Sequence, residues 1–302
     1  MGIEQVGQRI NDGIRDFADK VLGGGSQGTG ATRPADGGWD ASVGGKDAKP
    51  GFDRSMAKLA EAAYNPSQTH VDGWRRMGDG ELHAAGVDPS VQYRDGMLAG
   101  VYTDGNGHYA VAYAGNTGED VPSVIAQSAG LDTKQMHNAV DLANQVENAF
   151  GGDNVVFTGH SMGGSLAGAA AAATGSTSVV FNSQGVHDNT LSRLGLDPNA
   201  TRTVMAERSR AYGVDGDWAT HLQNDIPFTN ALPNALGSDL RIGNPEGISN
   251  LVNAHNMGPI VAAFDQGQPI RHGSEQPKIF EQPLQNLYNT FTGFLRFLPI
   301  TI

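Results

Sequence analysis

The sequence predicts an α/β fold in which helices flank a mostly parallel sheet. Short apolar runs typical of buried strands alternate with longer segments of helical spacing over most of the chain. A turn rich in Gly and Asn separates two early runs, which indicates a hairpin on the N-terminal side of the sheet. With 302 residues, the chain is long enough for one large domain with a substantial core.

The first 50 residues are expected to lie outside the main domain, which is expected to cover residues 51–302. Residues 3–22 place apolar side chains at spacings of three and four, as an amphipathic helix does. Residues 23–50 are dense in Gly and small polar residues. Such a composition buries too little apolar surface to order itself, so a flexible linker is expected there. The main domain is expected to begin near Phe52 with a helix.

The remaining elements follow in chain order. Strands are expected at 97–102, 109–113, 153–158, 178–182 and 210–214. Helices are expected at 133–150, at 162–173 and from about residue 255, with a stretch rich in Pro and Asn at 223–237. Apolar residues at helical spacing between Phe280 and Leu298 predict a C-terminal helix face.

Composition excludes several classes of protein. The chain carries 20 basic and 32 acidic residues, a net charge of -12, and no basic stripe, so no nucleic-acid partner is expected. It has no cysteine, which removes thiolate catalysis, cysteine zinc sites and disulfides. The start lacks the apolar core of a secretory signal, and no apolar run is long enough to span a bilayer.

The segment Gly159-His160-Ser161-Met162-Gly163 carries the clearest chemical signal. It has the pattern G-x-S-x-G, and it lies between an apolar strand and a helix of small residues. A serine at such a sharp turn projects its hydroxyl from the sheet, while the helix N-terminus behind it offers N–H groups to an oxyanion. The segment therefore predicts a nucleophile elbow, the α/β-hydrolase fold, and Ser161 as the nucleophile.

A serine nucleophile needs a base and an acid, which follow it in the chain order Ser, Asp or Glu, His in this fold. The histidines after Ser161 are His187, His221, His255 and His272. His255 is preferred because it opens an apolar helix, whereas His272 lies in an expected solvated loop. For the acid, Asp217 is preferred to Asp215, which looks like part of the turn after the strand at 210–214.

Asp225 and Asp239 are weaker alternatives for the acid, because we expect them to be solvated. Among the other histidines, His160 is expected to pack beside the site without a catalytic role. His108 and His137 precede the elbow and are expected to be solvated.

These residues resemble the class 3 lipases, α/β-hydrolases that cleave acylglycerols and phospholipids. The elbow resembles that family's G-H-S-L-G-G, and residues 110–117 resemble the strand and F-R-G-T segment that carry one side of its oxyanion hole. Residues 212–219 and 255–257 are similar to the segments with its acid and its base. The resemblance covers about residues 52–264. It implies a lipid esterase, either a phospholipase A acting at the sn-1 ester or a related lipase, that needs neither cofactor nor metal.

The same resemblance implies the donors of the oxyanion hole and the setting of the reaction. Met162 would supply its backbone N–H, and Asn116 the second donor, with Thr117 as the alternative. A glycine-rich, acidic version without a signal peptide is similar to bacterial phospholipases that specialised systems secrete, sometimes with a protective partner protein. The C-terminal apolar face would then either close over the core or lie in a lipid interface.

Two other functions stay open at this point. A thioesterase or a small-ester carboxylesterase could use the same fold, and a preference for chain length would distinguish it. A binding protein that has lost its activity is the second, although a complete Ser, Asp, His order argues against it. Reaction with a fluorophosphonate probe, which labels an activated serine, would distinguish an active enzyme from such a binding protein.

Overall fold

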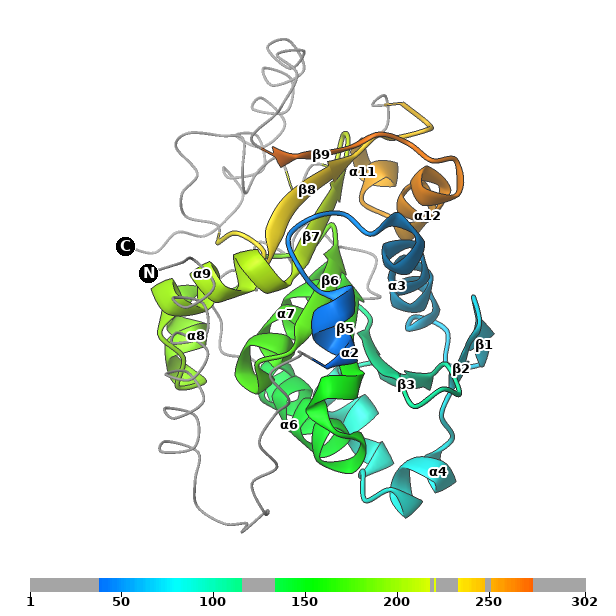
Figure 1. The fold of residues 1–302 in the computed structure, drawn as a ribbon, viewed down its shortest axis with the longest axis vertical. Coiled ribbons are helices and arrows are strands. Elements are labelled where there is room, and N and C mark those ends of the chain that lie inside the picture. Colours follow the sequence, from blue (N-terminus) through cyan, green and yellow to red (C-terminus); the bar gives the residue numbers. More distant parts are fainter. Residues whose placement is uncertain (1–37, 116–133, 218–219, 221–232, 248–250, 274–302) are drawn as a thin grey trace, which may run out of the picture.

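One nine-stranded sheet forms the centre of the computed structural model, which describes residues 38–115, 134–217, 220, 233–247 and 251–273 (Figure 1). The strands lie side by side in chain order. Their bounds are β1 His70–Val71, β2 Trp74–Arg76, β3 Ala99–Thr103, β4 Tyr109–Tyr113, β5 Val155–His160, β6 Thr177–Phe181, β7 Arg210–Val214, β8 Ser238–Ile242 and β9 Ile270–His272. Strands β4 to β8 are parallel, and the pairs at both ends of the sheet are antiparallel. The predicted α/β fold and the hairpin of β3 and β4 are confirmed.

Helices cover both faces of the sheet for a topological reason. Right-handed crossovers between strands that are neighbours in the chain all pass over the same face. That face carries α6 (Lys134–Phe150), α7 (Met162–Thr174) and α9 (Pro198–Arg208) (Figure 1). The opposite face is covered by α3 (Pro50–Ala62), which precedes the sheet, and by α12 (Met257–Asp265), which follows β8.

The remaining helices of the described residues are short. They are α2 Trp39–Val43, α4 Asp79–Ala84, η1 Pro89–Gly96, η2 Gly152–Asn154, α8 Asp188–Arg193 and α11 Leu251–Ala254. Among the described residues, no helix has both the length and the apolar character that crossing a bilayer requires.

The parallel strands are apolar on both sides because both faces of the sheet are covered. Successive residues point to opposite faces, so Val179 packs in the core on the α3 side and Val180 in the core on the α7 side. The register aligns Tyr113 with Gly159 and His160 with Phe181. The carboxyl ends of β4, β5 and β6 therefore meet at one edge of the sheet, and the residues that follow them lie close together.

The strands after β7 differ from the sequence prediction. Ser238–Ile242 and Ile270–His272 form β8 and β9, although no strand was expected at either position. His272 therefore lies in an edge strand and not in the solvated loop that was expected. The expected helices at 3–22 and 280–298 lie outside the described residues, as does most of the stretch at 223–237.

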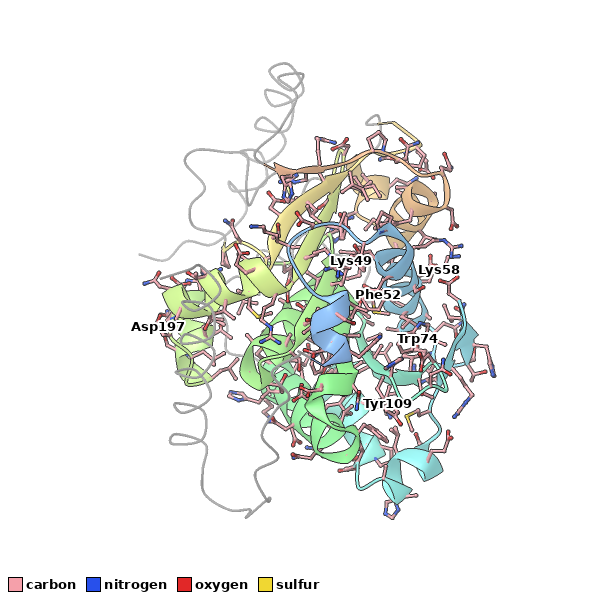
Figure 2. The ribbon with its side chains drawn as sticks, in the orientation of Figure 1. Lys49, Phe52, Lys58, Trp74, Tyr109 and Asp197 are labelled. Atoms are coloured by element: carbon pink, nitrogen blue, oxygen red, sulfur yellow. The ribbon has the colours of Figure 1, made fainter. Side chains whose placement is uncertain are left out.

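The prediction of a flexible linker over residues 23–50 is wrong for its last part. Residues 38–49, here called the N-terminal arm, include helix α2 and pack on the sheet, whereas residues 23–37 lie outside the described residues. The ring of Trp39 contacts Phe52 and Trp74, which both lie beside the arm (Figure 2). Asp40 is fully buried, and its carboxylate pairs with Arg208 at 3.3 Å.

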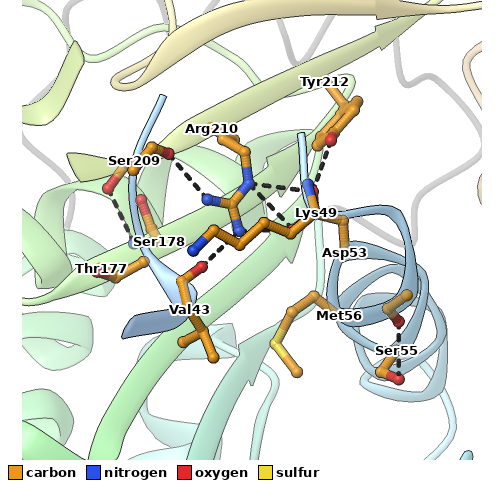
Figure 3. Close-up of polar contacts among 12 residues, drawn as sticks. Val43, Lys49, Asp53, Ser55, Met56, Thr177, Ser178, Ser209, Arg210 and Tyr212 are labelled. Carbon is orange, nitrogen blue, oxygen red and sulfur yellow. Dashed lines mark hydrogen bonds and ion pairs between the residues drawn. The ribbon is translucent and has the colours of Figure 1, made fainter. Parts of the chain in front are cut away.

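A buried ion pair between α3 and β7 holds the other end of the arm (Figure 3). Arg210 and Asp53 are both fully buried, with 2.6 Å between Arg210 Nη2 and Asp53 Oδ1. Arg210 Nη1 donates to the carbonyl of Gly45 and Nη2 donates to that of Val43, both at 2.8 Å. Long-range hydrogen bonds that local composition does not reveal therefore order the arm.

Removal of Arg210 is expected to destabilise the protein strongly. Arg210→Ala leaves the Asp53 carboxylate buried without its cation, which typically costs about 3–5 kcal/mol. Urea unfolding followed by circular dichroism measures the loss. Arg54→Ala is the matched control, because Arg54 also pairs with aspartates, Asp72 and Asp265, but at the exposed surface. Equal unfolding midpoints for the two variants would contradict the structural role of Arg210.

Candidate active site

Ser161 occupies a strained turn between β5 and α7. Its backbone angles are φ 56° and ψ -127°, a region that residues with a side chain rarely adopt. Backbone hydrogen bonds hold the turn, since the N–H of Ser161 donates to Phe181 at 3.1 Å and its carbonyl accepts from Gln184 at 3.0 Å. The predicted elbow is therefore present, with β6 and the chain after it as its support.

Glycines allow α7 to approach the sheet closely at this turn. A Cβ added to Gly163 would overlap the backbone of Tyr113 and Ala114, and one added to Gly164 would lie 2.5 Å from Ser183 Oγ. A Cβ at Gly159 would overlap the backbone of Gly163. The motif thus has glycine at the positions where α7 lies too close to the ends of β4 and β5 for a side chain, as a nucleophile elbow requires.

The structure brings the three predicted residues together in one hydrogen-bonded chain. His255 Nε2 lies 3.0 Å from Ser161 Oγ, and His255 Nδ1 lies 2.8 Å from Asp217 Oδ1. Ser161 and His255 are 4% exposed and Asp217 is fully buried. All three residues are thus shielded from bulk water. This is the geometry in which an imidazole can remove a proton from a serine hydroxyl.

Asp217 is held in its ionised form by its neighbours. Burial alone would raise the pKa of the carboxyl, but the nearby His255 and hydrogen bonds from His255 and Thr220 outweigh burial and lower it. The Thr220 backbone donates at 2.9 Å to Oδ2, and the Thr220 hydroxyl donates to the same oxygen. One carboxylate oxygen thus faces Thr220, which leaves the other to orient His255.

The alternative acids among the described residues have other partners. Asp215 accepts from Arg271 at 2.5 Å and 3.1 Å, so it ties the acid loop to β9. The side chain of Asp239 is 42% exposed and pairs with Arg241. Asp225 lies outside the described residues.

The other candidate histidines also lie apart from Ser161 or outside the described residues. His272 faces Asp47 at 3.6 Å, with 42% of its side chain exposed. His187 caps helix α8 by accepting from the N–H of Asn189. His221 lies outside the described residues. The base position is therefore occupied by His255 alone among the described histidines that follow the elbow.

His108 differs from the sequence prediction. It is half-buried, stacks on Trp39 with ring centroids 4.3 Å apart, and pairs with Asp104 at 2.7 Å. His137 is exposed, as expected.

The described residues contain one of the two predicted oxyanion donors. Met162 is the first residue of α7, where a backbone N–H has no acceptor within the helix. Asn116 and Thr117 lie outside the described residues, so the second donor stays a prediction. The N–H of Gly115 is already engaged, because it donates to the Tyr64 hydroxyl at 2.8 Å. A second backbone donor on this loop must therefore come after Gly115.

Sequence reasoning missed Asn182, which supports the base. Asn182 directly follows β6 and has a positive φ of 41°. Its Nδ2 donates to the carbonyls of Ala254 at 2.9 Å and His255 at 3.2 Å, and its Oδ1 accepts from the N–H of Val214 at 3.0 Å. A polar residue at the carboxyl end of a central parallel strand was the signal that could have revealed it.

His160 packs beside the site, as predicted. Burial lowers its pKa to about 3, with His255 nearby as the next cause, so the ring is neutral at physiological pH. Its two nitrogens lie 2.7 Å from the Tyr64 hydroxyl and 2.6 Å from the carbonyl of His255. In the part of the chain that the structure describes, no group of three or more acidic, His or Cys side chains could hold a metal ion.

Comparison with known proteins identifies the family. The sequence of residues 55–254 matches a protein-family model that is described as phospholipase-like, the Tle-like phospholipase domain. The chain is also 32% identical over 233 residues to an extracellular phospholipase A1 of Serratia liquefaciens, an alignment that covers 72% of each protein. The chain belongs to the Tle-like phospholipase family. This membership confirms the predicted resemblance to lipid-cleaving hydrolases, and it makes the chain a carboxylic ester hydrolase.

Two solved structures show a more distant likeness to this chain. Lipase II from Rhizopus niveus has a TM-score of 0.41 and 12% identity, over 68% of this chain and 84% of that one. The Rhizomucor miehei lipase in its propeptide complex has a TM-score of 0.44 and 12% identity, over 82% and 91% of the two chains.

The buried neutral His160 predicts that stability falls in acid. Its pKa is about 3 in the folded protein and 6.5 for the free side chain, so between these values the unfolded chain binds the proton that the folded protein excludes. Unfolding should therefore take up roughly one extra proton in this range. In His160→Gln, where Tyr64, His255 and Asp217 still face the position, urea midpoints should fall less between pH 7 and pH 4.

The control for this measurement is His83→Gln, which removes an exposed histidine. It should follow the wild-type pH dependence. Identical pH dependence in His160→Gln and the wild type would contradict a neutral buried imidazole.

Proposed function

We propose that this protein is a phospholipase A that hydrolyses the sn-1 ester of phospholipids, with Ser161, His255 and Asp217 as its catalytic triad. The hydrogen-bonded chain of these three residues at a strained elbow carries the proposal, since their distances of 3.0 Å and 2.8 Å suit proton transfer. The Serratia relative is a phospholipase A1, which supports the sn-1 position.

Acylation of Ser161 is the first half of the reaction. As Ser161 Oγ attacks the ester carbonyl carbon, His255 Nε2 takes the hydroxyl proton, and Asp217 stabilises the imidazolium that forms. The tetrahedral intermediate then collapses, and the bond to the alcohol oxygen of the glycerol breaks. His255 gives its proton to that oxygen, so a lysophospholipid leaves and the acyl group stays on Ser161.

Deacylation repeats these steps with water. His255 takes a proton from a water molecule that attacks the acyl carbonyl, and returns it to Ser161 Oγ as the fatty acid leaves. In both halves, negative charge develops on the former carbonyl oxygen. The Met162 backbone N–H would donate to that oxygen, with Asn116 or Thr117 as the second donor, and the N-terminus of α7 adds its positive dipole.

The proposal also covers how the protein meets its lipids and where it acts. The net charge of -12 opposes binding to anionic lipids, so we expect contact with a membrane to rest on apolar surface, for which the segment at 280–298 is a candidate. The extracellular relative supports the proposal that this protein is secreted. The proposed route is independent of a signal peptide. A protective partner in the producing cell would then keep the enzyme from its lipids.

We also propose that residues 51–302 form the catalytic domain, with the N-terminal arm packed on it.

The triad predicts a distinct pattern of losses. Ser161→Ala and His255→Ala should each reduce kcat about a million-fold, because the members of a triad act as a unit. Asp217→Asn should reduce it about 10⁴-fold by favouring the wrong imidazole tautomer. Hydrolysis of a soluble short-chain ester measures the effects. His272→Ala and Asp215→Asn are the controls and should keep near wild-type kcat. An active Ser161→Ala variant would refute the assignment, and an inactive His272→Ala would move the base.

The ester position is tested on phospholipid vesicles. Phosphatidylcholine labelled separately in its sn-1 and sn-2 acyl chains should release the sn-1 fatty acid first, and Ser161→Ala should release neither. Equal release from both positions would remove the sn-1 preference. Faster turnover of acyl thioesters or of short esters than of vesicles would instead indicate a thioesterase or a small-ester carboxylesterase. A protein that fails to react with fluorophosphonate would be a binding protein without activity.

A further inference from the structure

Two side chains, the half-buried Tyr64 and the buried His160, join the loops on either side of Ser161. Tyr64 lies just after α3, and His160 is the last residue of β5. The Tyr64 hydroxyl lies 2.7 Å from His160 Nδ1, and His160 Nε2 lies 2.6 Å from the carbonyl oxygen of His255. At its other end, Tyr64 accepts from the N–H of Gly115 at 2.8 Å. A continuous hydrogen-bonded chain thus runs from the loop after β4 to the backbone of the base.

The chain fixes the role of every hydrogen along it. A backbone N–H can only donate, so the Tyr64 oxygen accepts from Gly115 and its own hydrogen is directed to His160 Nδ1. The His255 carbonyl can only accept, so His160 carries its hydrogen on Nε2. Both requirements are met by one neutral tautomer of His160. The low pKa of this buried ring maintains that state at physiological pH.

The contact with His255 acts on its backbone and not on its ring. His160 and Asn182 Nδ2 both donate to the His255 carbonyl, from β5 and from the residue after β6 respectively. This carbonyl belongs to the short segment between α11 and α12, beyond the ends of both helices. With its backbone fixed by two strands and its ring fixed by Asp217, the imidazole keeps its direction toward Ser161.

We propose that Tyr64 and His160 are positioning residues that couple the loop at Gly115 to the backbone of His255 across Ser161. The inference rests on the proposed triad. Gly115 immediately precedes the candidate oxyanion donors Asn116 and Thr117. The chain therefore ties the backbone of Gly115 to the backbone of the base, close to Ser161. Neither Tyr64 nor His160 exchanges a proton with substrate in this role.

A positioning role predicts a specific kinetic signature. Loss of one contact should lower kcat roughly tenfold, the size of a single hydrogen bond, and should leave KM unchanged because binding surface is retained. A merely structural role would reduce the fraction of folded enzyme instead. Titration with a fluorophosphonate counts the intact sites, so kcat per titrated site separates the two.

Three substitutions divide the chain into its parts. Tyr64→Phe removes the hydroxyl and frees the N–H of Gly115. His160→Asn keeps an amide near the Nδ1 position for Tyr64 but loses the donor to the His255 carbonyl. His160→Gln places its amide near the Nε2 position and keeps that donor. We expect kcat per titrated site to be about tenfold lower in Tyr64→Phe and in His160→Asn. His160→Gln should recover much of this loss in kcat, because it keeps the donor to the His255 carbonyl.

Tyr109→Phe is the matched control, because it removes a tyrosine hydroxyl at the opposite end of β4, where the ring stacks on Phe150. It should keep wild-type kcat per site. In the double variant Tyr64→Phe with His160→Asn, the loss should be less than the product of the single losses, since both cut one chain.

The outcomes separate this inference from the triad itself. Wild-type kcat per titrated site in both Tyr64→Phe and His160→Asn, with an inactive Ser161→Ala, would overturn the coupling and leave the triad intact. Fewer titrated sites with unchanged kcat per site would assign Tyr64 and His160 a structural role only. An active Ser161→Ala would overturn the proposed function first.

Discussion

The backbone of Ser161 is the constraint on which the rest of the site depends. A serine at φ 56° is stable only where its surroundings leave no alternative, and here β5, β6 and α7 leave none. The glycines on both sides allow these elements to approach closely. At the turn, Phe181 at the end of β6 accepts from the N–H of Ser161, and Gln184 after β6 donates to its carbonyl. The other parts of the site are arranged around a hydroxyl that this turn holds at the edge of the sheet.

The parallel register then supplies those parts from separate strands. The carboxyl ends of β4, β5, β6 and β7 provide Gly115, His160, Asn182 and Asp217, while His255 arrives from the helical segment after β8. Hydrogen bonds among these residues connect the ends of the strands. They add to the backbone hydrogen bonds of the sheet. The result is a site in which each group has its direction set by a neighbour on a different strand, which suits a reaction that needs fixed geometry.

Sequence could predict the features that local pattern determines. The elbow follows from glycine spacing, and the choice of Asp217 and His255 follows from chain order and from the strand before the acid. It could not predict β8, because Asp239 and Arg241 make Ser238–Ile242 look polar although Leu240 and Ile242 are buried. Nor could it predict the ordered arm at residues 38–49, whose partners Arg208 and Arg210 lie more than 150 positions away. Such contacts depend on the tertiary fold.

The Asp53 and Arg210 pair also determines the order in which this chain can become locked during synthesis. The two residues are 157 positions apart, so Asp53 leaves the ribosome long before its partner exists. Until β7 has emerged and joined the sheet, nothing captures the carbonyls of Val43 and Gly45, and α3 keeps a hydrated carboxylate on the side that will face the core. Final closure of the amino-terminal region therefore waits until β7 has been synthesised and has joined the sheet.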